Sequence, residues 1–414
     1  QKSYSGKIKL IYIDPPYNTG NDLIYKDDFK NNSDFYLEQT GQSKDGLPLT
    51  TNSETSGRFH SDWISFMYPR LFLARNLLTD DGVIFVSIDN HEIHNLRFLM
   101  NDIFGEENFL SMIANVNNPK GRSDDKFFPT AHEYLIVYQK NHADLDGWKP
   151  EEHIIRRYNK KDENDKKYRE IDLRKTGDKD RRTDRPNLFY PFYHDPKTAK
   201  IFPSNDFNIP EGFTQILPLR QDGVEGRWRW ELDTAVEKIE FLFARYMPTG
   251  KRWSIFEKDY FIEDEKIKPT TAWTFKDVNS ERGTESFMDL GFKKEIFDNP
   301  KPLGLIKRII ELVLSPNSND FVLDFFAGSG STAHSVYELN KIDFGNRKFI
   351  CVQIPELCDQ KSDAFKDGYK TIASIGKTRI KNASEKIKRE NKEQKLSKSN
   401  QDLGFKVFKL AKSN

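Results

Sequence analysis

The sequence has little of what marks several common classes of protein. Among its 414 residues only two are cysteines, Cys351 and Cys358. Neither stands in CxxC or CxxH spacing, so neither a zinc site nor a disulfide framework is indicated. No apolar run reaches about 18 residues, so no membrane-spanning helix is predicted. These absences fit a protein of the reducing cytoplasm that needs no metal ion and no membrane.

A strong overall charge is also missing. The formal net charge is +1, so net charge says nothing about binding partners. The segment of residues 371–414 is basic when taken by itself, with 12 Lys and Arg against 4 Asp and Glu. The first residues, QKSYSGKIKLIYID, contain neither a methionine nor the apolar region of a signal peptide. We therefore expect a piece of a longer protein.

Apolar strands alternate with amphipathic helices in two separate regions, residues 1–145 and 293–375. Such alternation is typical of an α/β layer with a mostly parallel sheet. Between them, residues 146–292 hold charged stretches and the aromatic segments RPNLFYPFY and EGRWRWEL. A basic helix and a C-terminal segment, 376–414, follow. The simplest assembly is one sheet built from both α/β halves, with an inserted domain.

Local signals predict the ends of several elements. NHEIHNLRFLMNDIFG reads as a helix capped by Asn90 and ended near Gly105. KPLGLIKRIIELVL reads as a helix with Pro302 in its first turn. The segment GFKVFKL, residues 404–410, is predicted to be a last strand.

A glycine turn, DFFAGSGSTA, lies between a predicted strand and a predicted helix. Gly328 and Gly330 allow close approach of a ligand to the backbone, and the helix N-terminus offers free N–H groups. With Ala333 they match the GxGxxA dinucleotide fingerprint, and Glu356 lies about where that fold places its ribose acid. No Walker lysine is present, which argues against a P-loop. The ligand is a nicotinamide dinucleotide or S-adenosylmethionine, unless the turn is purely structural.

The segment LIYIDPPYNTGND ends a buried strand with Asp14, Pro15, Pro16 and Tyr17. In open α/β sheets, ligands bind beyond the carboxyl ends of strands. Two prolines fix the backbone and remove two N–H donors. The Asp14 carboxylate and the Pro15 carbonyl remain as a stiff pair of acceptors, which suits an amino group, and Tyr17 offers a face for stacking on a base. The structural alternative is a proline-stiffened turn capped by Asp14.

This acceptor pair suits methylation of an exocyclic amino nitrogen. The lone pair of such a nitrogen is delocalised into the ring, so the nitrogen is a poor nucleophile. Hydrogen bonds from its two hydrogens to Asp14 and Pro15 would draw it towards tetrahedral geometry. Positioning and charge stabilisation would then supply most of the rate, without a metal or a covalent intermediate.

Together, DPPY and FAGSG resemble the D/N/S-P-P-Y/F catalytic motif and the FxGxG cofactor motif of the DNA amino-methyltransferases. The catalytic motif comes first here, as in the β class of that family, whose target-recognition domain lies between the two halves. Further segments, among them TDDGVIFVSIDNHEI, FPTAHEYLIVYQK, KPLGLIKRII and FICVQIPE, resemble the modification (Mod) subunits of type III restriction-modification systems. The resemblance covers most of the chain.

The resemblance implies an α/β, Rossmann-like methyltransferase sheet with an inserted target-recognition domain and S-adenosylmethionine as the cofactor. It implies transfer of a methyl group to adenine N6 in duplex DNA, since cytosine N4 enzymes more often spell the motif SPPY; cytosine N4 remains the alternative. Asp14, Pro15 and Tyr17 would hold the flipped adenine. The cofactor would be bound by Asp324, Phe325, Phe326, Ala327, Gly328 and Gly330 and covered by Lys301 and Pro302. Gln353 stands where relatives place an acid that binds the ribose hydroxyls. Glu356 is therefore the acid expected to bind these hydroxyls instead.

Base flipping in duplex DNA requires contacts to the phosphate backbone from lysine and arginine. The candidates are Lys120, Arg122, Arg181, Arg182, Arg185, Arg227 and Arg229. The insert is expected to read the bases. The expected partners are double-stranded DNA, a restriction (helicase-nuclease) subunit and a second copy of the chain as a homodimer.

Three other functions remain open from the sequence. The glycine turn alone is compatible with an NAD-linked oxidoreductase, which leaves Asp14–Tyr17 unexplained. A DNA-recognition subunit with little turnover would carry the same motifs. An RNA or protein methyltransferase is the third, and the large insert favours DNA over it.

Overall fold

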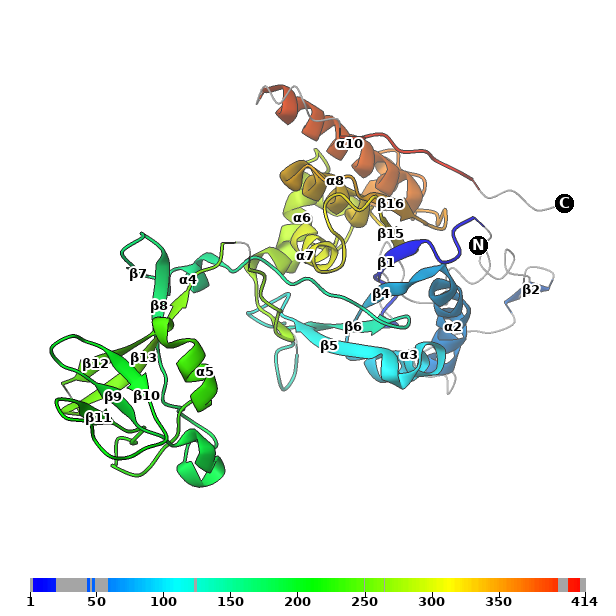
Figure 1. The fold of residues 1–414 in the computed structure, drawn as a ribbon. Coiled ribbons are helices and arrows are strands. Elements are labelled where there is room, and N and C mark those ends of the chain that lie inside the picture. The colour runs from blue at the N-terminus through cyan, green and yellow to red at the C-terminus, as the bar shows by residue number, and fades with distance from the viewer. Residues whose placement is uncertain are drawn as a thin grey trace. The chain divides into compact units, whose positions relative to one another are not determined.

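The computed structural model describes residues 3–19, 43–44, 47–48, 59–122, 125–248, 250–263, 265–393 and 401–409. The chain divides into two compact units, which are described separately here (Figure 1). The first contains Gln1–Trp148 and Lys268–Asn414, and the second contains Lys149–Ile267.

A seven-stranded sheet forms the centre of the first unit, in the order β14-β5-β6-β4-β1-β15-β16. Its strands are β1 (Ile8–Ile13), β4 (Leu78–Ile88), β5 (Phe109–Asn115), β6 (Glu133–Gln139), β14 (Ala272–Trp273), β15 (Phe321–Asp324) and β16 (Lys348–Cys351). Strand β6 runs antiparallel to both neighbours, and the other pairs are parallel. Strand β1 pairs directly with β15, so the prediction of one sheet built from both halves is confirmed.

Helices cover both faces of this sheet. They are α2 (Phe59–Leu77), α3 (Ile93–Phe104), α6 (Ser280–Met288), α7 (Leu303–Val313), α8 (Ser331–Asp343), α9 (Asp363–Lys366) and α10 (Ile372–Glu393). Because side chains alternate along a strand, Ile11 and Ile13 of β1 face a core made with α2 and α3. Leu10 and Tyr12 face a second core made with α7 and α8. This two-sided burial explains why β1 reads as a continuous apolar run.

Short elements complete the first unit. They are the two-residue strands β2 (Ser43–Lys44) and β3 (Leu47–Pro48) and the 3-10 turns Glu106–Asn108, Lys276–Val278 and Lys294–Ile296. Every helix in the described ranges is too short or too polar to cross a bilayer.

The predicted insert, residues 146–292, is longer than the second unit. Residues 268–292 belong to the first unit because they are built into it. Trp273 of β14 pairs with Asn115 of β5, and Phe287 of α6 is buried in the core under α10. Helix α10, predicted as part of a separate terminal segment, packs on the first unit through Ile375, Ala383 and other buried residues.

Three further sequence predictions differ from the structure. Helix α3 begins at Ile93 with Glu92 at its N-cap, so Asn90 lies outside it, whereas Gly105 ends it as predicted. Pro302 is the residue before α7 rather than part of its first turn. Residues 401–409 form no strand, because side chains bind this backbone: the Tyr337 hydroxyl donates to the Gly404 carbonyl at 3.1 Å.

The second unit consists of two small antiparallel sheets, in the orders β10-β9-β11 and β12-β13-β8-β7. Its elements are α4 (Glu152–Ile155), β7 (Lys160–Lys161), β8 (Lys167–Asp172), β9 (Phe192–His194), β10 (Ile201–Pro203), β11 (Thr214–Ile216), α5 (Leu232–Glu237), β12 (Leu242–Met247) and β13 (Arg252–Tyr260), with 3-10 turns at Arg182–Asp184, Pro186–Leu188 and Ile239–Phe241. The two aromatic segments noted in the sequence build its core. The Trp228 indole donates to the Tyr190 carbonyl at 2.8 Å, and Tyr190 donates to the Trp230 carbonyl at 3.0 Å.

Candidate active site

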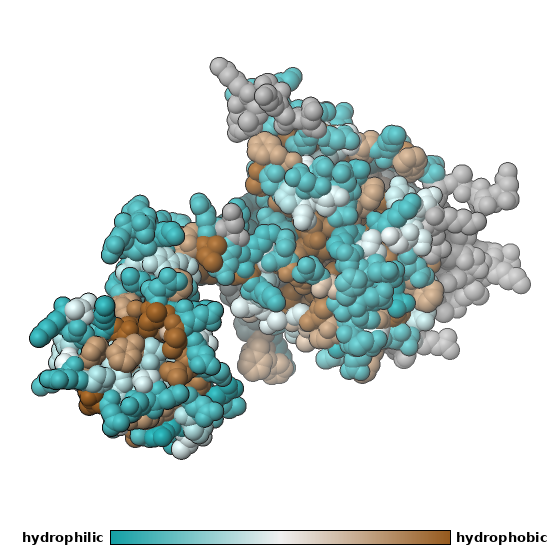
Figure 2. Space-filling model, in the orientation of Figure 1, coloured by the Kyte–Doolittle hydropathy of each residue, from teal (hydrophilic) through white to brown (hydrophobic). Residues whose placement is uncertain are grey.

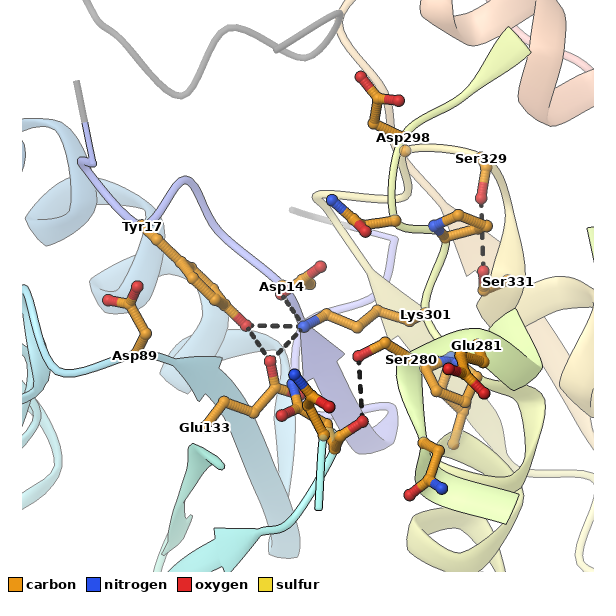
Figure 3. Close-up of a pocket in the computed structure, with 18 of the residues that line it drawn as sticks. Asp14, Tyr17, Asp89, Glu133, Ser280, Glu281, Asp298, Lys301, Ser329 and Ser331 are labelled. Atoms are coloured by element: carbon orange, nitrogen blue, oxygen red, sulfur yellow. Dashed lines mark hydrogen bonds and ion pairs between the residues drawn. The ribbon is translucent and has the colours of Figure 1, made fainter. Parts of the chain in front are cut away.

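A cavity of about 640 Å³ opens in the first unit beyond the carboxyl ends of β1 and β15 (Figure 3). Asp14 follows the last residue of β1, and Asp324 is the last residue of β15. Because the two strands are parallel neighbours, their ends meet at one edge of the sheet. The DPPY motif and the glycine turn therefore line the same cavity, as the fold rule predicts.

The structure brings most of the predicted site residues of the first unit to this cavity. Its lining includes Asp14, Pro15, Tyr17, Lys120, Arg122, Lys301, Pro302, Asp324, Phe326, Ala327 and Gly328. Five predicted residues lie outside the lining: Pro16, Phe325, Gly330, Gln353 and Glu356. The Pro16 carbonyl instead accepts a hydrogen bond of 2.8 Å from the Trp63 indole, which anchors the motif to α2.

Four side chains form a charged cluster at the catalytic motif (Figure 3). The Lys301 ammonium donates to the Tyr17 hydroxyl at 2.7 Å and to the Glu133 carboxylate at 2.8 Å. It also lies 3.2 Å from Oδ1 of Asp14. The Tyr17 hydroxyl donates to Glu133 at 3.0 Å. Lys301 was predicted to cover the cofactor, and the structure places its ammonium between the two carboxylates.

Burial and the neighbouring charges together set the protonation states of this cluster. Burial raises the pKa of Asp14, although the nearby Lys301 ammonium opposes the rise. Burial alone would lower the pKa of Lys301, but Asp14 and Glu133 outweigh it and raise that pKa. Burial and the same two carboxylates raise the pKa of Tyr17. At neutral pH, Lys301 is therefore a cation and Tyr17 a neutral hydroxyl.

A buried carboxylate behind the motif holds its backbone in place. Glu92 is fully buried and accepts hydrogen bonds from the Asn18 amide at 2.6 Å and the Asn95 amide at 2.8 Å. The His60 ring lies 2.7 Å from the same carboxylate. Asn18 follows Tyr17 and has a φ of +59°, a conformation that asparagine tolerates better than most residues. Sequence reasoning missed Glu92, Asn18 and Glu133, although all three lie within the quoted blocks.

Helix α6 approaches the segment that carries Lys301 very closely. A Cβ atom added to Gly283 would lie 1.7 Å from the Pro300 carbonyl oxygen and 3.1 Å from the Lys301 carbonyl carbon. Only glycine fits there. The segment with Lys301 can therefore take its observed position only because residue 283 is a glycine.

We expect Gly283→Ala to displace the Pro300–Pro302 segment and to destabilise the fold by about 1–3 kcal/mol, the usual cost of overpacking. Catalytic turnover should fall as well, because Lys301 would leave Asp14 and Glu133. Urea unfolding and initial methylation rates would measure both effects. Met288→Ala, on an exposed position of the same helix, should change neither.

The glycine turn is fixed by contacts on its outer side. The Gln353 side-chain oxygen accepts a hydrogen bond of 2.7 Å from the Gly328 amide. Gly330 has a φ of +81°, and a Cβ there would lie 3.2 Å from the Gly376 carbonyl of α10. A Cβ on Gly376 would in turn lie 2.9 Å from the Gly328 carbonyl. Gln353 and Gly330 thus shape the turn from outside the cavity.

Asp324 organises the inner side of the turn. Its carboxylate accepts hydrogen bonds from the Thr332 hydroxyl at 2.6 Å and from the Phe326 amide at 3.0 Å. Burial nevertheless raises the pKa of Asp324 to about 7, against the effect of these two bonds. A raised pKa means that the folded protein holds this proton at pH values where the unfolded chain has lost it.

We expect this proton to make the fold less stable as the pH rises from about 4 to about 7, because only the unfolded chain is free to lose the proton at little cost. A shift of this size corresponds to roughly 4 kcal/mol. Asp324→Asn does not titrate, so its unfolding free energy should fall less over the same range. Urea titrations at several pH values test this. Asp298→Asn, an exposed carboxyl nearby, should leave the wild-type slope unchanged.

A buried arginine sits under the end of the glycine turn. Arg379 of α10 is fully buried and donates to the hydroxyls of Ser329 and Ser331, both at 2.7 Å. No carboxylate pairs with it in the described part of the chain. Burial lowers the pKa of Arg379 to about 9, so it remains a cation at neutral pH. Together with the N-terminus of α8, it makes this side of the cavity suited to an anionic group such as a carboxylate.

The predicted DNA-binding residues fall in both units. Lys120 and Arg122 line the cavity. The other five, Arg181, Arg182, Arg185, Arg227 and Arg229, lie in the second unit, where bridges join their two segments. Arg182 pairs with Glu225 at 3.0 Å, Arg229 lies 3.6 Å from Glu257, and Arg227 donates to the Lys179 carbonyl at 2.6 Å. Their contact with DNA remains a prediction.

The described residues contain no group of His, Cys, Asp and Glu able to hold a metal ion. The cavity instead offers hydroxyls and backbone amides on the side of the glycine turn. On the side of the motif it offers the carboxylates of Asp14 and Glu133 as acceptors, with the Lys301 ammonium between them.

Comparisons with known proteins agree with this site. A family model for DNA methylases matches residues 8–358. The chain is 36% identical to the type II methyltransferase M.KpnI of Klebsiella pneumoniae, over 91% of this chain and 82% of that protein. It is 33% identical to the EcoPI Mod subunit of Escherichia phage P1, over 93% of this chain and 60% of that protein. It is 34% identical to the StyLTI Mod subunit of Salmonella typhimurium, over 99% of this chain and 58% of that protein.

The chain thus spans about 60% of the length of these two Mod subunits. The predicted resemblance to type III Mod subunits and the predicted α/β methyltransferase fold are confirmed. The matched region holds both motifs that line the cavity, and the chain belongs to the DNA methylase family.

Proposed function

We propose that this protein transfers a methyl group from S-adenosylmethionine to the N6 amino group of adenine in duplex DNA, as part of a restriction-modification system. One observation carries the proposal: the DPPY motif and the glycine turn, far apart in the sequence, line a single cavity of about 640 Å³. That volume is in the range of ligand pockets. Membership of the DNA methylase family supports the same chemistry.

The residues on the glycine-turn side fit S-adenosylmethionine. Asp324 and the positive φ of Gly328 shape the turn. Ser329 and Ser331 line the cavity and accept hydrogen bonds from the buried Arg379, so their hydroxyls can donate to the carboxylate of the cofactor. When bound, the cofactor supplies an electrophilic methyl group. Gln353 and Glu356 lie outside the lining of the cavity, and their role at the ribose hydroxyls stays a prediction.

The residues on the motif side fit a planar base with an amino group. Oδ1 of Asp14 is buried and, in the described structure, has no hydrogen bond of regular geometry besides its ion pair with Lys301. An amino group could donate to this oxygen and to the Pro15 carbonyl. Tyr17 would stack on the base, and its raised pKa keeps the ring neutral. Transfer would be direct, and positioning would supply most of the rate.

The second unit supports a role as the target-recognition domain. It is inserted between the two halves of the methyltransferase sheet and presents arginines on two bridged segments. We propose that it contacts duplex DNA. The similarity to Mod subunits of restriction-modification enzymes also supports a restriction subunit as a partner. The helicase-nuclease character of that subunit and the homodimer stay predictions. The cytoplasmic location stays a prediction.

The proposed function can be tested directly with methyl-labelled S-adenosylmethionine and mixed-sequence plasmid. After digestion to nucleosides, N6-methyladenine should carry the label. Labelled N4-methylcytosine would keep the family and overturn the base assignment. DNA binding without any label would favour a recognition subunit with little turnover.

A further inference from the structure

Two adjacent phenylalanines stand almost fully in solvent on the connection between β5 and β6. Phe127 is 78% exposed and Phe128 is 88% exposed. On the face of the first unit that Figure 2 shows, most of the coloured surface is hydrophilic. Single exposed apolar side chains are common, but two neighbouring aromatic rings at this exposure leave a large apolar area in water.

The described residues on either side of these rings contact one another. The Arg122 amide donates to the Thr130 carbonyl at 3.2 Å, and the Thr130 amide donates to the Asp125 carboxylate at 2.6 Å. Gly121 has a φ of +73°, and a Cβ there would lie 2.3 Å from Cβ of Pro129. The two sides of the connection are therefore in close contact, and the rings project from a supported tip.

The same connection forms part of the catalytic cavity. Lys120, Arg122 and Thr130 line the cavity, and Glu133 of the charged cluster begins β6 directly after it. The three cations Lys120, Arg122 and Lys126 lie along the same segment as the rings. A base held at Asp14 would thus be attached to a phosphate backbone that passes this connection, and cations there suit phosphates.

We propose that Phe127 and Phe128 enter the base stack of duplex DNA at the place that the target base leaves. This inference rests on the proposed function, because it requires a flipped base. Flipping removes one base from the stack and exposes the faces of its neighbours. Apolar side chains, phenylalanine among them, are inserted between base steps by other DNA-binding proteins. A ring at this position would restore the stacking contact that the flipped base has lost.

The test compares two short duplexes that contain the methylated site mapped on plasmid. In one the target base is normally paired, and in the other it lies opposite an abasic position, where leaving the helix costs less. The double variant Phe127→Ala/Phe128→Ala should methylate the paired duplex about 10- to 100-fold more slowly than wild type, the size expected for a lost stacking contact. On the duplex with the abasic position the deficit should largely disappear. Phe128→Trp should retain most activity.

Phe98→Ala is the matched control, because Phe98 is 75% exposed on α3 of the same unit. It should behave as wild type on both duplexes. An equal loss on both duplexes, or no loss on either, would overturn the inference. Normal rates with a changed oligomeric state would assign the rings to a protein interface instead. If wild-type protein labels no DNA at all, the proposed function itself fails, and that result is distinct from the others.

Discussion

Asp14→Ala is expected to reduce the rate of methyl transfer by about 100- to 1,000-fold, while S-adenosylmethionine still binds. The variant removes the charged acceptor that would hold the amino group and polarise it, and the loss of one such preorganised group typically costs about 100- to 1,000-fold. The cofactor side of the cavity should remain intact, because Asp324 is held by hydrogen bonds from Thr332 and Phe326, and Arg379 is held by Ser329 and Ser331. Single-turnover rates and equilibrium binding of the cofactor measure the two effects separately.

Two further variants make this result specific. Asp14→Asn keeps an oxygen acceptor but loses the charge, so its rate should fall between those of wild type and Asp14→Ala. Asp298→Ala changes an exposed carboxyl that lines the same cavity, and it should retain nearly full activity. Wild-type turnover by Asp14→Ala would contradict the assignment of Asp14 as the acceptor.

Lys301→Met should have the second largest effect, and its signature is the pH dependence. Burial raises the pKa of Asp14, and the Lys301 ammonium opposes that rise. Without the ammonium the pKa of Asp14 rises further, so the fraction of charged Asp14 at neutral pH falls. The acid limb of the pH–rate profile should therefore move to higher pH. Removing the cation also leaves the buried Glu133 with hydrogen bonds from Tyr17 and Asn115 but without its cationic partner, which should destabilise the fold by about 3–5 kcal/mol.

The pH–rate profile and urea unfolding measure both consequences. Lys293→Met is a suitable control, because it removes an exposed ion pair with Asp367 at 2.8 Å, whose side chains are 67% and 32% exposed. Exposed pairs of this kind contribute little to stability. A Lys301→Met profile with an unchanged acid limb would show that this ammonium does not act on Asp14.

The fold and the meeting of the two motifs were predictable because each rests on a local pattern. The apolar runs of β1 and β15 indicate strands buried on both faces, and Asp14 and Asp324 stand at their carboxyl ends. In a parallel sheet such ends share one edge, so no knowledge of distant contacts was required. The same logic correctly placed Gly328 in the cavity.

The remaining features depend on contacts between distant segments, which no local pattern encodes. The position of Lys301 beside Glu133 depends on the close approach of α6 at Gly283. Gly330 matches a cofactor fingerprint, yet a Cβ atom added to it would meet the Gly376 carbonyl of α10 at 3.2 Å. Residues 404–409 have the composition of a strand, but no sheet edge receives them. The C-terminal boundary of the insert was predicted at residue 292, whereas the second unit ends at Ile267. The difference arises because Trp273 joins a sheet whose other strands lie far away in the sequence.

The pairing of β1 with β15 has a consequence for synthesis on the ribosome. Ile8 pairs with Phe321, so roughly 300 residues separate the partners. At about 5–20 residues per second, β1 waits about 15–60 s after it emerges before β15 can be added. Until then β1 can pair only with β4, along one of its two edges. The opposite edge offers free N–H and C=O groups beside apolar side chains. The nascent chain therefore passes through a long interval in which this edge of β1 is open to pairing with other strands, and the insertion of the second unit lengthens that interval.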